Sequence, residues 1–137
     1  ICGGAGATPN GDGASAVHTH MTNTRITDPE ILERRFPVRI CEFSIRKDSG
    51  GSGQQRGGDG VVREFEFLDQ VTISVMAEHR IEEPYGMNQG QNGKAGKQFI
   101  QVNGDWKEIN GSASTTLNFG DRFRIETPGG GGFGPEK

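Results

Sequence analysis

Apolar and polar residues alternate along much of the chain after residue 37. In residues 61–68 (VVREFEFL) and 71–80 (VTISVMAEHR), apolar side chains recur mostly at every second position, and residues 38–46 (VRICEFSIR) follow this rule less regularly. A period of two is typical of a β-strand that buries one face. Because turn signals separate these short runs, we predict antiparallel strands at all three places.

Two further pairs of strands are predicted from the turns between them. The runs QFIQV and DWKEI flank Asn103-Gly104, a pair that suits a type I′ hairpin because both residues tolerate a positive φ. The runs STTLNF and RFRIET flank Gly120-Asp121 in the same way. We therefore predict two hairpins in the last third of the chain.

One helix is predicted, in the run TDPEILERR at residues 27–35. Thr27 is suited to cap its first turn, Glu30 stands three residues later, and Pro29 is well accepted at the start of a helix. Pro37 should end the helix after about two turns.

Together these elements predict a mainly β fold, with an antiparallel β-sandwich or barrel-like domain over residues 27–137 that includes the short helix. Residues 1–26 are predicted to form an extended, glycine-rich N-terminal arm. The sequence opens with Ile1 and a glycine cluster rather than with Met. We therefore expect a fragment whose arm packs on sequence upstream of residue 1.

Composition narrows the possible partners and the compartment. Glycine supplies 23 of 137 residues without a three-residue repeat, which indicates many tight turns and excludes collagen. With a net charge of −3 and no basic face, we expect no nucleic-acid partner, and no apolar run is long enough to span a membrane. Cys2 and Cys41 have no metal-ligand spacing, which is typical of reduced thiols in a cytoplasmic protein.

Glycine-rich stretches raise the question of phosphate binding. GGGGFG at residues 129–134 has dinucleotide-motif spacing but no helix after it, and GQNGKAGKQ lacks P-loop spacing. No ATP site is therefore predicted in this chain. The loop at residues 48–60 has two interpretations. Its N–H groups and Arg56 bind an anion, or it is a wide connection in which Asp59 is a turn residue.

The stretch VHTHMTNTR holds two histidines two residues apart. In an extended chain His18 and His20 share a face, so both could bind one metal ion, with Asp12 or Asp28 as a third ligand. Alternatively, both imidazoles hydrogen-bond to backbone or carboxylate groups and organise the arm. The sequence leaves the metal unknown.

Polar side chains continue directly after the histidines. Thr22, Asn23, Thr24 and Arg25 place several donors and one fixed cation within four residues. Because unpaired donors are costly in a core, this cluster is better suited to bind a small anionic substrate or an amide.

Three blocks of this sequence resemble a known family. The blocks are GGAGA followed by DGASAVHTHMTNTRITDPEILERRFPV, then GSGQQRGGDGVVREFEFL, then ETPGGGGFG. In this order they resemble the carboxy-terminal part of the hydantoinase B/oxoprolinase family. HTHMTNTRITDPEILE and EEPYG are most similar to the members that open 5-oxo-L-proline to L-glutamate with ATP. N-methylhydantoinases and acetone carboxylase subunits remain alternatives.

The resemblance implies a division of labour. A hydantoinase A-like half would bind ATP and Mg and activate the cyclic amide by phosphorylation, and the B-like half would complete hydrolysis. We therefore expect an A-like partner, a small-molecule substrate, a homo-oligomeric full-length enzyme and a possible divalent metal in the B-like half. The isolated chain should bind no cofactor and be inactive. As an alternative, the domain is a structural module that docks the two halves.

The resemblance and the donor clusters together assign expected roles. Glycine N–H groups would stabilise the oxyanion, and a guanidinium would bind the substrate carboxylate in bidentate fashion. The catalytic candidates are His18, His20 and Asn23, and the substrate-binding candidates are Asp12, Thr22, Arg25, Arg56 and Asp59.

Overall fold

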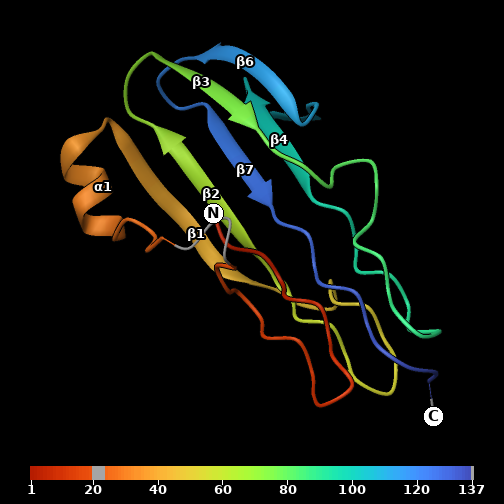
Figure 1. The fold of residues 1–137 in the computed structure, drawn as a ribbon. Helices are drawn as coiled ribbons and strands as arrows, with labels where there is room; N and C mark the ends of the chain where they lie inside the picture. Colours follow the sequence, from red (N-terminus) through yellow and green to blue (C-terminus); the bar gives the residue numbers. More distant parts are fainter. Residues whose placement is uncertain (20–23, 137) are drawn as a thin grey trace.

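Seven strands, one helix and several extended glycine-rich segments make up the computed structural model, which describes residues 1–19 and 24–136 (Figure 1). The elements in chain order are α1 (Pro29–Arg35), β1 (Val38–Arg46), β2 (Gly60–Phe67), β3 (Val71–Met76), β4 (Lys97–Val102), β5 (Asp105–Glu108), β6 (Ser112–Leu117) and β7 (Arg122–Glu126). The predicted mainly β fold with one short helix is confirmed.

The strands form two antiparallel sheets around a shared core. The larger sheet has the order β1-β2-β7-β4-β5, and β3 pairs with β6 in a second, two-stranded sheet. Alternate residues of β7, Phe123 and Ile125, are buried together with residues of the small sheet, as the period of two predicts. Both sheets contribute to the buried apolar cluster of Val38, Phe67, Val75, Leu117, Phe123 and Ile125.

One of the two predicted hairpins is confirmed and the other is wrong. β4 and β5 join through Asn103 and Gly104, whose φ angles of 52° and 86° are those a type I′ turn needs. In contrast, β6 pairs with β3, whereas β7 pairs with β2 and β4. The backbone of Phe67 exchanges hydrogen bonds with Gly120 and Asp121, so the turn crosses from the small sheet to the large one.

The start of the helix and the end of one strand differ from the prediction. Asp28, not Thr27, caps α1, because its carboxylate accepts the N–H of Glu30 at 2.9 Å. The predicted strand over residues 71–80 ends at Met76. Shortly after it His79 has a φ of 52°, which a continuing strand does not allow.

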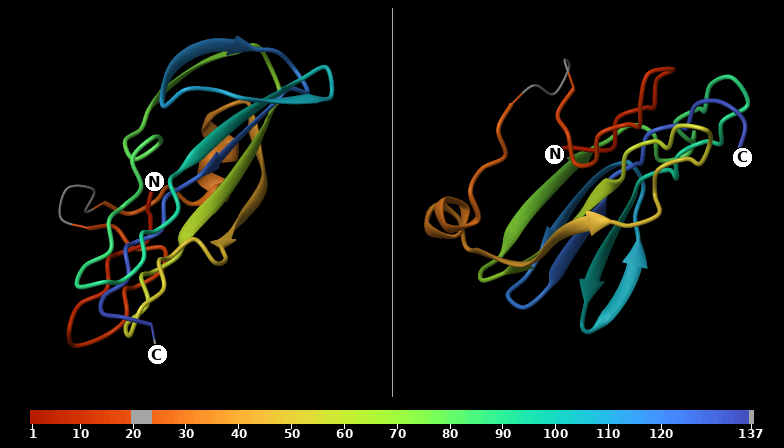
Figure 2. Two further views of the ribbon diagram at one scale, coloured as in Figure 1. Left: turned by 90° about the vertical axis from the view of Figure 1, so that its right-hand side faces the viewer. Right: turned by 90° about the horizontal axis from the view of Figure 1, so that it is seen from below.

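The glycine-rich segments lie side by side at the end of the large sheet (Figures 1 and 2). We call them the glycine bundle, comprising residues 3–7, 11–16, 49–58, 84–94 and 128–134. The 128–134 segment is central, since it exchanges backbone hydrogen bonds with residues 3–7, 49–58 and 84–94. The arm is thus held by the rest of the chain at this point, and its packing on upstream sequence stays a prediction.

Glycine is required in the bundle because its segments meet backbone to backbone. A β-strand has hydrogen-bonded neighbours on two sides and side chains on the other two, whereas the central segment has neighbours on more sides. A Cβ at Gly58 or Gly130 would lie closer than 3.0 Å to backbone atoms of the arm, and one at Gly129 would do so to Ser49 and Gly50. The high glycine content therefore reflects this packing as well as turns.

Candidate functional site

A cleft separates the end of the described arm from the segment after β3. It comprises two adjoining hollows, of about 380 and 570 Å³. Gly4, Thr19, His79 and Pro128 line both of them. The hollow of about 380 Å³ is lined by bundle residues, including Tyr85. The hollow of about 570 Å³ reaches Ile125 of the large sheet. Their volumes lie within the range of small-molecule sites.

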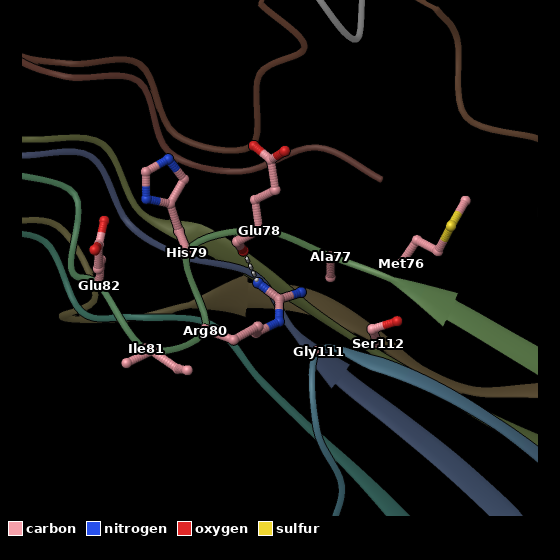
Figure 3. Close-up of a pocket in the computed structure, with 9 residues that line it drawn as sticks. All are labelled: Met76, Ala77, Glu78, His79, Arg80, Ile81, Glu82, Gly111 and Ser112. Carbon is pink, nitrogen blue, oxygen red and sulfur yellow. Dashed lines mark hydrogen bonds between the residues drawn. The ribbon is translucent and has the colours of Figure 1, made fainter.

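His79 is the titratable side chain that lines both hollows. Its φ of 52° is unusual for a residue with a Cβ, and its carbonyl accepts the N–H of Gly96 at 2.8 Å. That bond fixes the turn while the side chain stays exposed. Figure 3 shows His79 and Glu78 pointing toward the arm. Sequence reasoning missed His79 because the strand pattern was read through it, although the charged run EHRIEE marks where the strand stops.

His18 lies next to the cleft but does not line it. Both of its ring nitrogens are shielded from solvent and have no hydrogen-bond partner in residues 1–19 and 24–136. An unpartnered buried imidazole is costly, so it calls for a partner beyond the described residues. His20, Thr22 and Asn23 lie outside the described residues, and their predicted roles stay predictions.

Three other predicted site residues come together in the bundle. The Asp12 carboxylate accepts the Arg56 N–H at 2.7 Å, and the Arg56 guanidinium lies 2.8 Å from Asp59. The same Asp59 oxygen accepts the N–H groups of Ser49 and Gly50 at 3.0 and 2.8 Å. This anion pocket of loop 48–60 is thus filled by the chain's own carboxylate. The substrate-binding roles of these residues stay predictions, as does that of the exposed Arg25.

The contacts of Asp59 set its charge state. Burial raises the pKa of its carboxyl, but the hydrogen bonds from Arg56 and from the N–H of Gly50 outweigh burial and hold the pKa below its usual value. The bond to Asp59 in turn raises the pKa of Arg56. Both groups are therefore charged at neutral pH, and they brace the loop.

Several of the glycine N–H groups that were predicted to stabilise an oxyanion instead donate hydrogen bonds within the bundle. The N–H groups of Gly51, Gly58, Gly130 and Gly132 donate to main-chain carbonyls of neighbouring bundle segments, and that of Gly57 donates to Gly51 in its own segment, all at 2.8–2.9 Å. These donors are not free to meet a substrate. Chemistry in the cleft therefore depends on its side chains more than on these glycines.

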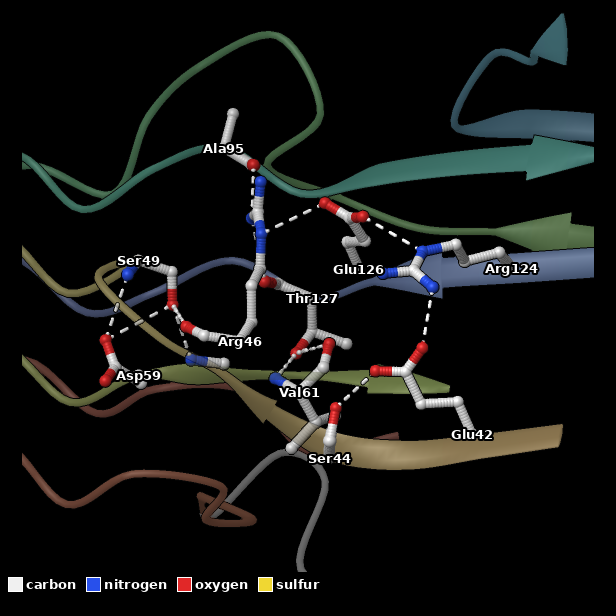
Figure 4. A network of polar contacts seen from close by, with 11 residues as sticks. Glu42, Ser44, Arg46, Ser49, Asp59, Val61, Ala95, Arg124, Glu126 and Thr127 are labelled. Carbon is white, nitrogen blue, oxygen red and sulfur yellow. Dashed lines mark hydrogen bonds and ion pairs between the residues drawn. The ribbon is translucent and has the colours of Figure 1, made fainter. Parts of the chain in front are cut away.

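A network of charges joins strands β1, β2 and β7 of the large sheet (Figure 4). Arg46 donates to the carbonyls of Ala95 and Thr127 and lies 3.2 Å from Glu126. Arg124 contacts three carboxylates, those of Glu42, Glu64 and Glu126. Burial lowers the pKa of Arg124, but hydrogen bonds to the three glutamates outweigh it and raise the pKa above its usual value. The network fixes the strands that carry one wall of the cleft.

In the part of the chain that the structure describes, neither a metal-binding cluster nor a membrane-spanning helix is found. Residues 1–19 and 24–136 contain no group of three or more His, Cys, Asp or Glu side chains placed to hold a metal ion. The predicted metal role of His18 and His20 stays a prediction, because His20 is outside these ranges. Among the same residues, no helix has the length and apolar character needed to cross a bilayer.

Comparison with known proteins covers almost the whole chain. Residues 1–136 match the family described as hydantoinase B/oxoprolinase. The chain is 47% identical over 136 residues to 5-oxoprolinase 1 of Arabidopsis thaliana and 48% identical over 135 residues to 5-oxoprolinase of Dictyostelium discoideum. Each match covers 98% of this chain and 11% of the relative. The chain thus spans only a small part of the length of these relatives.

The fold is also similar to a solved structure. The crystal structure of an ATP-dependent caprolactamase from Pseudomonas jessenii superposes with a TM-score of 0.84 at 28% sequence identity. The match covers 98% of this chain and 25% of the caprolactamase chain. The sheets and the glycine bundle therefore recur in a larger protein.

Proposed function

Because the chain belongs to the hydantoinase B/oxoprolinase family, we propose that it is part of an ATP-dependent enzyme that opens 5-oxo-L-proline to L-glutamate. Two 5-oxoprolinases are 47–48% identical to it. The caprolactamase with the similar fold is, by its name, an ATP-dependent enzyme acting on another cyclic amide. Both comparisons support lactam opening as the reaction.

In this proposal the chain supplies one wall of the hydrolysis site. An unstrained amide needs activation before water attacks at a useful rate, and a phosphorylated amide supplies a better leaving group. A hydantoinase A-like half would bind the ATP and Mg for that step. The B-like half, including this chain, would then position the activated lactam and the attacking water.

The cleft between the arm and His79 is the observation that carries this proposal. An imidazole on a fixed turn can accept the proton of an attacking water. His79 is exposed to the cleft and points toward the arm (Figure 3). We assign it the role of general base. His18, His20 and Asn23 keep their proposed catalytic roles at the neighbouring end of the arm.

The test is a kinetic comparison in the full-length polypeptide. Release of ADP and glutamate should depend on 5-oxo-L-proline, and His79→Gln should lower kcat by about 100-fold, the usual contribution of a general base. Asn88→Gln is the matched control, because Asn88 is also exposed with a φ of 54° but does not line the cleft. Unchanged kcat in His79→Gln would remove His79 from the mechanism, and absence of any 5-oxoproline-dependent turnover would remove the substrate.

A second candidate function is structural docking of the two enzyme halves. It is favoured by large apolar side chains that are almost fully exposed, including Met76 at 92% and Ile81 at 95%. If His79→Gln keeps full activity while the full-length protein loses thermal stability, docking becomes the better assignment. Turnover of hydantoins or acetone in place of 5-oxo-L-proline would point to the N-methylhydantoinase or acetone carboxylase relatives.

A further inference from the structure

A half-buried arginine lies at the centre of a third hollow, of about 870 Å³, beside the cleft (Figure 3). Burial lowers the pKa of Arg80, and the nearby charge of Arg46 lowers it further. Within residues 1–19 and 24–136, no carboxylate forms an ion pair with Arg80. Glu78 meets it through the main-chain carbonyl, at 3.0 Å, while the Glu78 side chain points away toward the arm.

A hydrogen bond to Gln98 holds the guanidinium of Arg80 in one orientation. Its Nε donates to the side-chain oxygen of Gln98 at 2.6 Å, and the Gln98 amide nitrogen donates to the carbonyl of Ile109 at 3.1 Å. Gln98 is only 1% exposed. A glutamine is an expensive residue in a sheet core unless its hydrogen bonds are met, so this position is best explained by the need to hold Arg80.

Two glycines make room for the same side chain. A Cβ at Gly96 would collide with the Arg80 guanidinium, and a Cβ at Gly111 would lie 2.9 Å from the Arg80 Cγ. Figure 3 shows the guanidinium between Glu78 and Gly111. Arginine carries five N–H donors, and the described residues accept from only two positions, Nε and Nη1. The two N–H groups of Nη2 and one of Nη1 therefore have no acceptor among the described residues.

We propose that Arg80 binds the carboxylate of a small organic acid in this hollow. A planar guanidinium matches a carboxylate with two parallel hydrogen bonds, and an anion would offset the cost of burying an unpaired cation. The apolar side chains of Met76 and Ile81 form the rim and suit the hydrocarbon part of the ligand. Glu82 also lies at the rim, but it is exposed, so water screens its charge.

The position of the hollow connects this site to the proposed reaction. Residues 76–80 line both this hollow and the deeper hollow of the cleft, so an acid held by Arg80 would extend toward His79. The identity of the acid as 5-oxo-L-proline rests on the proposed function. The alternative source of the same carboxylate is an Asp or Glu side chain from another part of the polypeptide.

The two sources are distinguished with a pair of probes in the full-length polypeptide. 2-Pyrrolidinone is the same lactam as 5-oxo-L-proline without the carboxylate. Arg80→Met should lower kcat/KM for 5-oxo-L-proline by roughly 10- to 100-fold, the range expected for lost hydrogen bonds to a charged group, and leave kcat/KM for 2-pyrrolidinone unchanged. Arg39→Met is the matched control, because Arg39 is an exposed arginine on another part of the large sheet.

Each outcome decides between the sources. Loss confined to 5-oxo-L-proline supports a substrate carboxylate. Equal loss for both probes, accompanied by a lower melting temperature, overturns it in favour of a side-chain partner, and no loss overturns the site altogether. If the wild-type polypeptide turns over neither probe, the proposed function fails. Thermal-shift titration with the same two compounds then tests Arg80 alone, and the proposal requires an Arg80-dependent preference for the acid.

Discussion

Replacing Gly130 by alanine should separate the arm from the rest of the glycine bundle. A Cβ at this position would lie 2.6 Å from the N atom of Gly6 and closer still to the carbonyl of Ala5. Ordinary contact begins at 3.4 Å, so the arm must move by at least 3.4 − 2.6 = 0.8 Å. The obstacle is the backbone of the arm, which cannot swing away as a side chain can.

This displacement is enough to break the bonds that hold the arm. The N–H of Gly4 lies 3.0 Å from the carbonyl of Pro128, and the N–H of Ala7 lies 2.9 Å from that of Gly131. A shift of 0.8 Å directly away from the central segment, along these bonds, would lengthen the distances to 3.8 and 3.7 Å, beyond hydrogen-bonding range. Two lost hydrogen bonds at about 1 kcal/mol each, together with about 1 kcal/mol of overpacking, give a cost of about 3 kcal/mol.

Hydrogen exchange measured by mass spectrometry on the full-length polypeptide checks this value. The arm amides should exchange roughly 100-fold faster in Gly130→Ala, because about 3 kcal/mol of local opening energy is lost. Gly11→Ala is the matched control, since a Cβ there meets no atom within 4 Å. If the arm stays as protected in Gly130→Ala as in Gly11→Ala, the backbone-to-backbone account of the bundle is wrong.

Two further predictions concern charged groups outside the cleft. The hydrogen bonds of Asp59 lower its pKa, so their contribution, about 2 kcal/mol for a charged group, is present at neutral pH and is lost as the pH falls below about 4. The destabilisation caused by Asp59→Asn should accordingly shrink between pH 6 and pH 3 in thermal melts. Asp28→Ala should cost about 1 kcal/mol at the start of α1, and Asp28→Asn much less. Exchange about fivefold faster in residues 29–35 for the alanine variant alone would show this.

Local patterns predicted the strands because burial of one face leaves a period of two in the sequence. The hairpin at Asn103-Gly104 was equally accessible, since two residues determine its turn. The pairing of β6 with β3 was not, because it joins residues about 40 positions apart. No local signal at Gly120 distinguishes a turn back into the same sheet from a crossing to the other.

The glycine bundle and the cleft could not be predicted from the sequence. Glycines that pack against backbone have no side-chain pattern to read, so the sequence left loop 48–60 as either a wide connection or an anion site. The contact between Asp12 and Arg56 crosses 44 positions. His79 and Arg80 were absorbed into a strand pattern, because only their backbone angles and neighbours set them apart.

The position of the central glycine segment within the chain has a consequence for biosynthesis. Residues 3–7, 49–58 and 84–94 all leave the ribosome before residues 128–134, the segment that they surround. At about 5–20 residues per second, the arm waits roughly 6–25 s for its central partner. During that interval the N–H groups of Gly4 and Ala7 lack their acceptors, the carbonyls of Pro128 and Gly131. A nascent chain stalled before residue 128 should therefore be cleaved readily in the arm and in loop 48–60, even where the sheet strands already made have begun to pair.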